Sequence, residues 1–185
     1  MHLHYSFLAT AFNVLYAAGG PTDIGSLRNI EVFRKGKKVR TLDLYDFLLR
    51  GDLSDDIGLV DQDVIMIPYV DKRVVLNGAV RNPKMFELKA GENLNTVINF
   101  AGGFSEKAYT KTLRIDRVTD RKRIIKVSKA EFAGFTLQKG DIIIVDNVLE
   151  RFENKVSVSG AVFRPGDYEL ETGMSLKNCL LRPKG

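Results

Sequence analysis

Apolar and polar residues alternate along residues 74–80, the period of two that predicts a half-buried β-strand. Asn82-Pro83 follows this run and predicts a turn, because proline fixes φ and cannot donate a hydrogen bond to a β-ladder. A second short apolar run at 85–88 predicts the return strand. The stretch is therefore predicted to form a β-hairpin.

After Gly91 the apolar period lengthens to that of a helix. Within residues 94–101, the positions i, i+3, i+4 and i+7 are apolar, the stripe of an amphipathic helix. Either Glu92 or Asn93 can cap its start. Gly102-Gly103 can adopt the positive φ that ends a helix.

The hairpin pattern returns 82 residues later, along residues 156–162. Gly78 then corresponds to Gly160, and Pro83 corresponds to Pro165. Aromatic, leucine and further glycine positions keep the same spacing, which chance rarely produces. The chain is therefore predicted to be a repeat protein.

The other elements occur twice, in the order helix, two hairpin strands, helical turn and closing strand. The first set is predicted at 10–20, 30–34, 41–44, 45–49 and 63–67. The second set is predicted at 94–103, 113–117, 124–127, 128–132 and 141–145. The first helix is expected to bury Val14, Leu15 and Ala18.

This order predicts an α+β fold of tandem β-grasp repeats, one complete and two partial. Repeat 1 (10–70) lacks the opening hairpin, repeat 2 (73–146) is complete, and repeat 3 (155–185) has the hairpin and the start of a helix. Since neither end of the chain coincides with a repeat boundary, we interpret the sequence as a fragment of a longer protein.

Composition narrows the possible classes of protein only modestly. The chain is 44% hydrophobic and 28% charged, typical of a soluble globular protein. A net charge of +5 permits contact with acidic polymers, but a solvated basic surface explains it as well. No apolar run approaches the roughly 20 residues of a membrane helix. One cysteine, Cys179, excludes an internal disulfide framework, and we expect it to be buried by a helix.

The repeated motif resembles the soluble-ligand-binding β-grasp (SLBB) repeats of the outer-membrane polysaccharide export family. The string V-x-G-x-V-x-x-P-x-x-Y/F-x-L, a glycine, a helix ending in A-G-G and a closing G-D-x-I-x-V carry the resemblance. The motif positions that define the repeats are Gly78, Pro83, Gly91, Gly102, Gly103, Gly140, Asp141, Gly160, Pro165, Gly166 and Gly173.

This resemblance implies a non-enzymatic periplasmic part of an outer-membrane-associated capsule or exopolysaccharide exporter. Such a part would build the wall of a conduit as a homo-oligomer and contact the polysaccharide or an inner-membrane polysaccharide co-polymerase, without a cofactor. The alternative is a soluble-ligand-binding or DNA-uptake module that recognises an anionic ligand.

Catalytic chemistry finds little support in the sequence. No G-x-S-x-G, H-E-x-x-H, P-loop or G-x-G-x-x-G motif occurs, and the two histidines, His2 and His4, lie in the N-terminal tail. We expect no metal site there, because they have no partner ligands nearby. Asp61, Asp63 and Asp141 could act as acid and base, but they precede closing strands in turns where aspartate commonly binds backbone. We expect no enzyme.

Basic residues recur at the same hairpin turn of repeats 1 and 2 and are the candidate ligand-binding residues. An acidic glycan is the candidate ligand, and a solvated turn that protects a sheet edge is the competing interpretation. Nucleic acid is disfavoured because no aromatic residues are interleaved. The set comprises Arg34, Lys35, Lys37, Lys38, Arg40, Arg121, Lys122 and Arg123.

Two further expectations concern packing. Repeat 3 supplies a hairpin that repeat 1 lacks, so 155–181 of one molecule could complete 10–70 of the next. Five aromatic residues are expected in a core or interface: Phe7, Phe12, Tyr16, Phe132 and Phe135.

Overall fold

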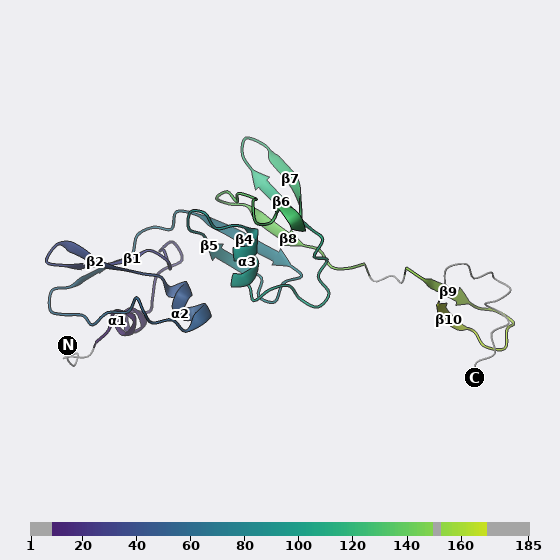
Figure 1. Cartoon of the computed structure of the whole chain (residues 1–185), viewed down its shortest axis with the longest axis horizontal. Coiled ribbons are helices and arrows are strands. Elements are labelled where there is room, and N and C mark those ends of the chain that lie inside the picture. The colour runs from purple at the N-terminus through teal and green to yellow at the C-terminus, as the bar shows by residue number, and fades with distance from the viewer. Residues whose placement is uncertain (1–8, 150–152, 170–185) are drawn as a thin grey trace. The chain divides into compact units, whose positions relative to one another are not determined.

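The computed structural model describes residues 9–149 and 153–169 (Figure 1). One compact unit ends at Val148 and a second begins at Leu149. The first unit contains repeats 1 and 2, and the second contains the hairpin of repeat 3. The fold is α+β, with one mixed sheet and two antiparallel sheets among the described residues, which confirms the predicted class. The exact repeat boundaries stay predictions.

Repeat 2 forms one five-stranded sheet with strand order β5-β4-β8-β6-β7. β4 and β8 are parallel, and the other pairs are antiparallel. The sequence order of strands, helix, hairpin, helical turn and closing strand is as predicted. The elements are β4 (Arg73–Gly78), β5 (Lys84–Glu87), α3 (Leu94–Phe100), β6 (Thr112–Val118), β7 (Lys122–Ser128), the 3-10 turn η1 (Lys129–Glu131) and β8 (Ile142–Val145).

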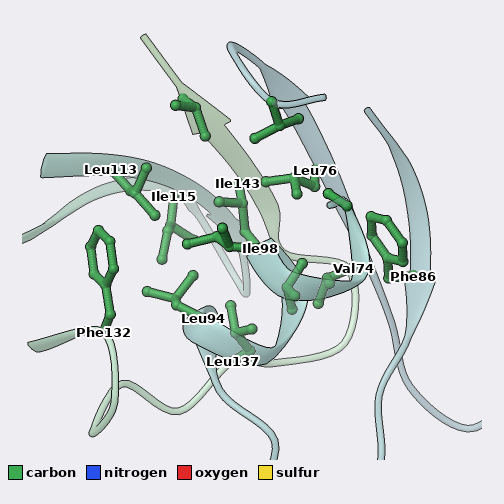
Figure 2. Packing of buried hydrophobic residues seen from close by; sticks show 14 of the residues in the cluster. Val74, Leu76, Phe86, Leu94, Ile98, Leu113, Ile115, Phe132, Leu137 and Ile143 are labelled. Carbon is green, nitrogen blue, oxygen red and sulfur yellow. The ribbon is translucent and has the colours of Figure 1, made fainter. Parts of the chain in front are cut away.

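The core of repeat 2 lies between this sheet and α3. Ile143 of β8 is fully buried and points into the same layer as Ile115 of β6 and Leu76 of β4, with Leu94 of α3 facing them (Figure 2). Phe86 of β5 closes one side of this cluster. The opening hairpin therefore contributes directly to the core, because it brings its apolar face to β8.

Two local signals in repeat 2 behave as the sequence predicts. Asn93, rather than Glu92, caps α3: its side chain accepts a hydrogen bond from the backbone N–H of Thr96, in a reciprocal capping box. Gly102 and Gly103 have φ of 76° and 95° and end the helix.

Gly78 is required for a different reason. Its φ is 89°, and a Cβ added to it would lie 2.1 Å from the carbonyl oxygen of Val145. The glycine therefore permits the close approach of β4 to the end of β8.

Repeat 1 contains the same elements as repeat 2, except that the described residues include no opening hairpin for it. Its sheet has strand order β2-β1-β3, and its return strand ends at Leu42 because Asp43 caps the next helix. The predicted strand at 41–44 therefore extends too far. The elements are α1 (Ala11–Ala17), β1 (Ile30–Arg34), β2 (Lys37–Leu42), α2 (Leu44–Arg50) and β3 (Val64–Met66).

The buried face of α1 differs from the prediction. Ala11, Phe12 and Leu15 are buried, whereas Val14 is half-buried and Ala18 is exposed. The reason is that no hairpin covers this side of the helix in residues 9–149, as β4 and its turn do in repeat 2. Ala18 was thus wrongly assigned to the buried stripe.

The five aromatic residues predicted to lie in a core or interface differ in their burial. Phe12 and Phe132 are buried and Phe135 packs against the core of repeat 2, as expected. Tyr16 is 89% exposed, so it does not belong to a core. Phe7 and Cys179 lie outside the described residues.

The second unit contains a two-stranded antiparallel hairpin, β9 (Lys155–Val158) and β10 (Gly166–Glu169). Its pairing runs from Lys155 opposite Glu169 to Val158 opposite Gly166. The equivalent pairs of β4 and β5 run from Arg73 opposite Glu87 to Leu76 opposite Lys84. The predicted third hairpin is therefore present in the register of the second.

Candidate functional site

The β1–β2 turn presents the candidate cations of repeat 1. Arg34 pairs with Lys37 across the hairpin, which leaves Lys35 and Gly36 as a two-residue loop. Both loop residues have positive φ, 49° and 74°, as a type I′ turn requires. This tight turn holds Lys35 and Lys37 at the exposed end of the hairpin.

Arg34 lies at the base of the turn, and its guanidinium is already hydrogen-bonded within the protein. Its Nε and Nη2 donate to the two carboxylate oxygens of Asp63 at 2.9 and 2.8 Å, and Nη2 also reaches the Gly58 carbonyl at 3.1 Å. The hydrogen bonds from Arg34 and from the Val60 N–H lower the pKa of Asp63 to about 2. The Asp63 hydrogen bonds in turn raise the pKa of Arg34.

Repeat 2 contains the same arrangement. Arg117 donates from Nε and Nη2 to Asp141 at 2.8 and 2.7 Å, and to the Thr136 carbonyl at 3.1 Å. Asp141 also accepts from the Gln138 N–H, as Asp63 does from Val60. The two aspartates thus link the basic hairpin of each repeat to its closing strand. Their contact with arginine accounts for these carboxylates better than an acid–base role does.

The eight predicted ligand residues therefore fall into two groups. Arg34, Lys38 and Arg40 are engaged by Asp63, Glu31 and Asp55, although the last pair is 4.0 Å apart. In the described residues, the other five are exposed and form no ion pair: Lys35, Lys37, Arg121, Lys122 and Arg123. These five belong to turns of two separate sheets, and no described hydrogen bond joins the turns.

A buried cluster that the sequence analysis missed joins repeats 1 and 2. Its centre is Arg28, whose side chain is 4% exposed. The guanidinium contacts Asp43 of repeat 1 at 3.1 Å and Glu92 of repeat 2 at 2.6 Å. It also lies over the rings of Tyr45 and Phe100, with its central carbon 4.8 and 5.0 Å from their centroids.

The charged groups of this cluster stabilise one another in their ionised forms. Burial acts to lower the pKa of Arg28, but hydrogen bonds to Glu92 and Asp43 outweigh it and raise the pKa. Burial acts to raise the pKa of Asp43, but hydrogen bonds from Lys89 and Arg28 lower it. Because each buried charge needs partners from both repeats, the cluster fixes how repeat 1 meets repeat 2.

Glu87, at the end of β5, completes this junction. Its carboxylate accepts from the Ser26 hydroxyl at 2.5 Å and from the Leu27 N–H at 2.8 Å. Its own N–H donates to the Tyr45 hydroxyl at 2.9 Å. Burial raises the pKa of Tyr45, so its phenol stays protonated at neutral pH.

The signal for this junction was a break in the repeat. Arg28 and Asp43 stand where repeat 2 has Lys111 and Lys126, so the pair is particular to the first repeat. A shallow groove beside the junction is lined by Pro21, Thr22, Leu27, Arg73 and Met85, among others. Arg73 is held there by the carbonyls of Asp23 and Gly25.

Two kinds of feature are absent from the described part of the chain. It contains no group of three or more His, Cys, Asp or Glu side chains placed to bind a metal ion. It also contains no helix with the length and hydropathy of a membrane span. His2 and His4 lie outside the described residues.

The sequence matches the SLBB domain over residues 9–43, 73–126 and 155–182, which is more than half of the chain. The chain therefore belongs to the SLBB domain family, a class of β-grasp domains associated with soluble-ligand binding. Each of the three matched segments overlaps one of the three predicted repeats. A search of curated proteins gives no match.

Proposed function

We propose that this chain is a non-enzymatic periplasmic segment of a capsule or exopolysaccharide export protein, part of an outer-membrane-associated assembly. In this proposal it forms part of a conduit wall and contacts an acidic glycan through its basic turns. An inner-membrane polysaccharide co-polymerase is the expected protein partner. The support is SLBB family membership together with the arrangement of the two turns.

The observation that carries the proposal is the repeated design of the basic hairpins. In both repeats an arginine at the base is bound to an aspartate that precedes the closing strand. Five of the cations beyond it (Lys35, Lys37, Arg121, Lys122 and Arg123) are exposed and form no ion pair in the described residues. Because the base is pinned, these cations stay at the surface, where they can attract a polyanion.

The junction between repeats supports a structural role. A conduit wall needs domains with a fixed mutual orientation, and the Arg28 cluster supplies hydrogen bonds from both sides of the contact. Arg73 adds a second link, since it lies in β4 of repeat 2 and donates to carbonyls of repeat 1. Such a pair of repeats is suited to act as one rigid block.

The test is a titration with a linear polyuronate, compared with a neutral dextran of similar length. Replacing all five exposed cations (Lys35, Lys37, Arg121, Lys122 and Arg123) with Gln should weaken polyuronate binding at least about tenfold at low salt, where surface charges are least screened. Lys129→Gln with Lys139→Gln is the control, because both are exposed lysines away from the two turns. It should change binding less than about twofold.

Two outcomes would count against the proposal. Equal binding of polyuronate and dextran would mean that charge does not select the ligand. Tighter, salt-dependent binding of duplex DNA than of polyuronate at equal ionic strength would favour the DNA-uptake alternative.

A further inference from the structure

The sheet of repeat 2 has one face covered by α3 and an opposite face, called here the outer face. Leu76, Ile115 and Ile143 point toward α3 (Figure 2), so their neighbours along each strand point to the outer face. On β8 these neighbours are Ile142 and Ile144, so the strand is apolar on both faces. Apolar residues on both faces are typical of a strand in a sheet that is covered on both sides.

The strand registers align the outer residues in two rows across the sheet. In the first row, Val75 of β4 lies opposite Ile142 of β8. Asp116 of β6 lies opposite Ile142 on one side and opposite Ile124 of β7 on the other. Ile142 is half-buried and Ile124 is 67% exposed. This row is therefore mainly apolar and open to solvent.

The second row carries positive charge. Ile144 lies opposite Arg114, and Arg114 lies opposite Lys126 of β7. Arg114 is 3.2 Å from Asp116, whereas Lys126 is exposed and forms no ion pair in the described residues. The outer face thus combines an apolar row with a row that has an excess of cations.

Repeat 1 presents an apolar surface of the opposite charge, formed by α2 and the loop that follows it. Leu48 is 64% exposed, Leu49 45% and Leu53 53%. Residues 46–56 contain four aspartates and one arginine, so the surroundings of these leucines are acidic. Exposed leucines that gather on one surface indicate a protein contact.

The exposure of Leu48 does not depend on an opening hairpin. In repeat 2, which has its hairpin, residues 129–131 hold the positions equivalent to 46–48 and are also exposed. Leu48 corresponds there to Glu131, whose carboxylate accepts hydrogen bonds from Ser128. Repeat 1 therefore carries an apolar residue at an exposed position where repeat 2 carries an acid, which points to a contact that is particular to repeat 1.

We propose that α2 and its loop in one molecule pack on the outer face of repeat 2 in a second copy of this chain. Both surfaces are apolar, and their charges are opposite, so the chain itself carries the two halves of one contact. A helix on the outer face would give the sheet its second covering layer.

The two surfaces are different, so the contact is heterologous and propagates into a ring or a filament. The contact needs no glycan. Assembly and glycan binding can therefore fail independently of each other, and assembly is measured without glycan.

Sedimentation velocity of the whole chain tests the contact. The mass of the unmodified chain should rise with concentration. Leu48→Glu and Ile124→Glu each place a carboxylate in one of the two surfaces, and each should weaken association at least about tenfold, because a buried charge without a partner is costly. Circular dichroism should show both variants folded, since the two side chains are 64% and 67% exposed.

A mixture of the two variants separates this contact from pairing of like surfaces. Leu48→Glu keeps an intact outer face, and Ile124→Glu keeps an intact α2 surface, so one contact can form between them. The equimolar mixture should therefore sediment as a dimer, although each variant by itself is a monomer. The dimer should not grow further, because its two remaining surfaces are both substituted.

Tyr69→Glu is the matched control, because Tyr69 is 80% exposed and lies after β3, outside both surfaces. It should assemble as the unmodified chain does. A mixture of Leu48→Glu and Ile124→Glu that stays monomeric would overturn the proposal. Assembly of either variant by itself would show that like surfaces pair. A monomer at every concentration for the unmodified chain would show that the two surfaces are covered by another protein or within the same chain.

Discussion

Repeats 1 and 2 share the same backbone plan but differ in what they bury. The isolated bridge between Gly25 and Tyr69 in repeat 1 corresponds to that between Ala108 and Asn147 in repeat 2. The arginine–aspartate contacts also correspond atom by atom. Their cores are unequal: repeat 2 has a large buried cluster that includes its opening hairpin, and repeat 1 has a small one.

The difference shows that hydrogen bonding and burial depend on different parts of the sequence. Turns and helix caps are set by residues close in the chain, so they recur in repeat 1. In the described residues no strand lies beside β3 as β4 lies beside β8, so β3 and one side of α1 are less buried than β8 and α3. Repeat 1 instead relies on its contact with repeat 2 through Arg28.

The largest expected effect comes from breaking that contact. Arg28→Met removes the cation and leaves Asp43 and Glu92 with fewer partners, so the free energy of unfolding should fall by about 3–5 kcal/mol. Calorimetry should then resolve a separate, earlier transition for repeat 1. The control is Lys38→Met, which removes an ion pair of a half-exposed lysine with Glu31 and should cost less than about 1 kcal/mol. One unchanged transition in Arg28→Met would show that the repeats are joined by other contacts.

A matched pair of valines measures the difference in packing. Val97 is fully buried in α3, and Val14 holds the equivalent place in α1 but is half-buried. Val97→Ala should therefore cost about 2 kcal/mol in urea unfolding, and Val14→Ala less than about 1 kcal/mol, when the protein is dilute. Equal costs would mean that α1 is covered as well as α3 in solution.

The smallest expected effect concerns the pH dependence of the stability of repeat 1. The pKa of Asp63 is lowered from its ordinary 3.8 to about 2, so its contribution to stability is complete above about pH 4. This contribution is lost as the pH falls from about 4 to about 2. Asp63→Asn should lower stability at neutral pH and flatten the profile in that window.

Acid titration of unfolding midpoints checks this prediction. Asp61→Asn is the control, because Asp61 lies in the same turn but is exposed and forms no described hydrogen bond or ion pair. It should leave the profile unchanged. A profile for Asp63→Asn that is as steep as that of the unmodified chain would contradict the assigned cause.

Much of the fold was predictable because its signals are local. The cap of α3, predicted at Glu92 or Asn93 and found at Asn93, the glycine pair after α3 and the alternation in β4 each act within a few residues. The candidate site was predictable only in part. Both turns are basic in the sequence, but Arg34 looks the same there as Lys35, and only folding brings it to Asp63, 29 residues away.

The sequence by itself determined the order of elements, the repeat spacing and the SLBB class, because turns, caps and periodic apolar positions are written in short stretches. Tertiary structure alone decided which cations stay exposed, that Arg28 joins two repeats, and that the outer edge of β3 carries no strand among the described residues. The physical reason is that an ion pair or a buried side chain depends on groups that are far apart in the chain. A local sequence pattern does not predict which of these groups come into contact.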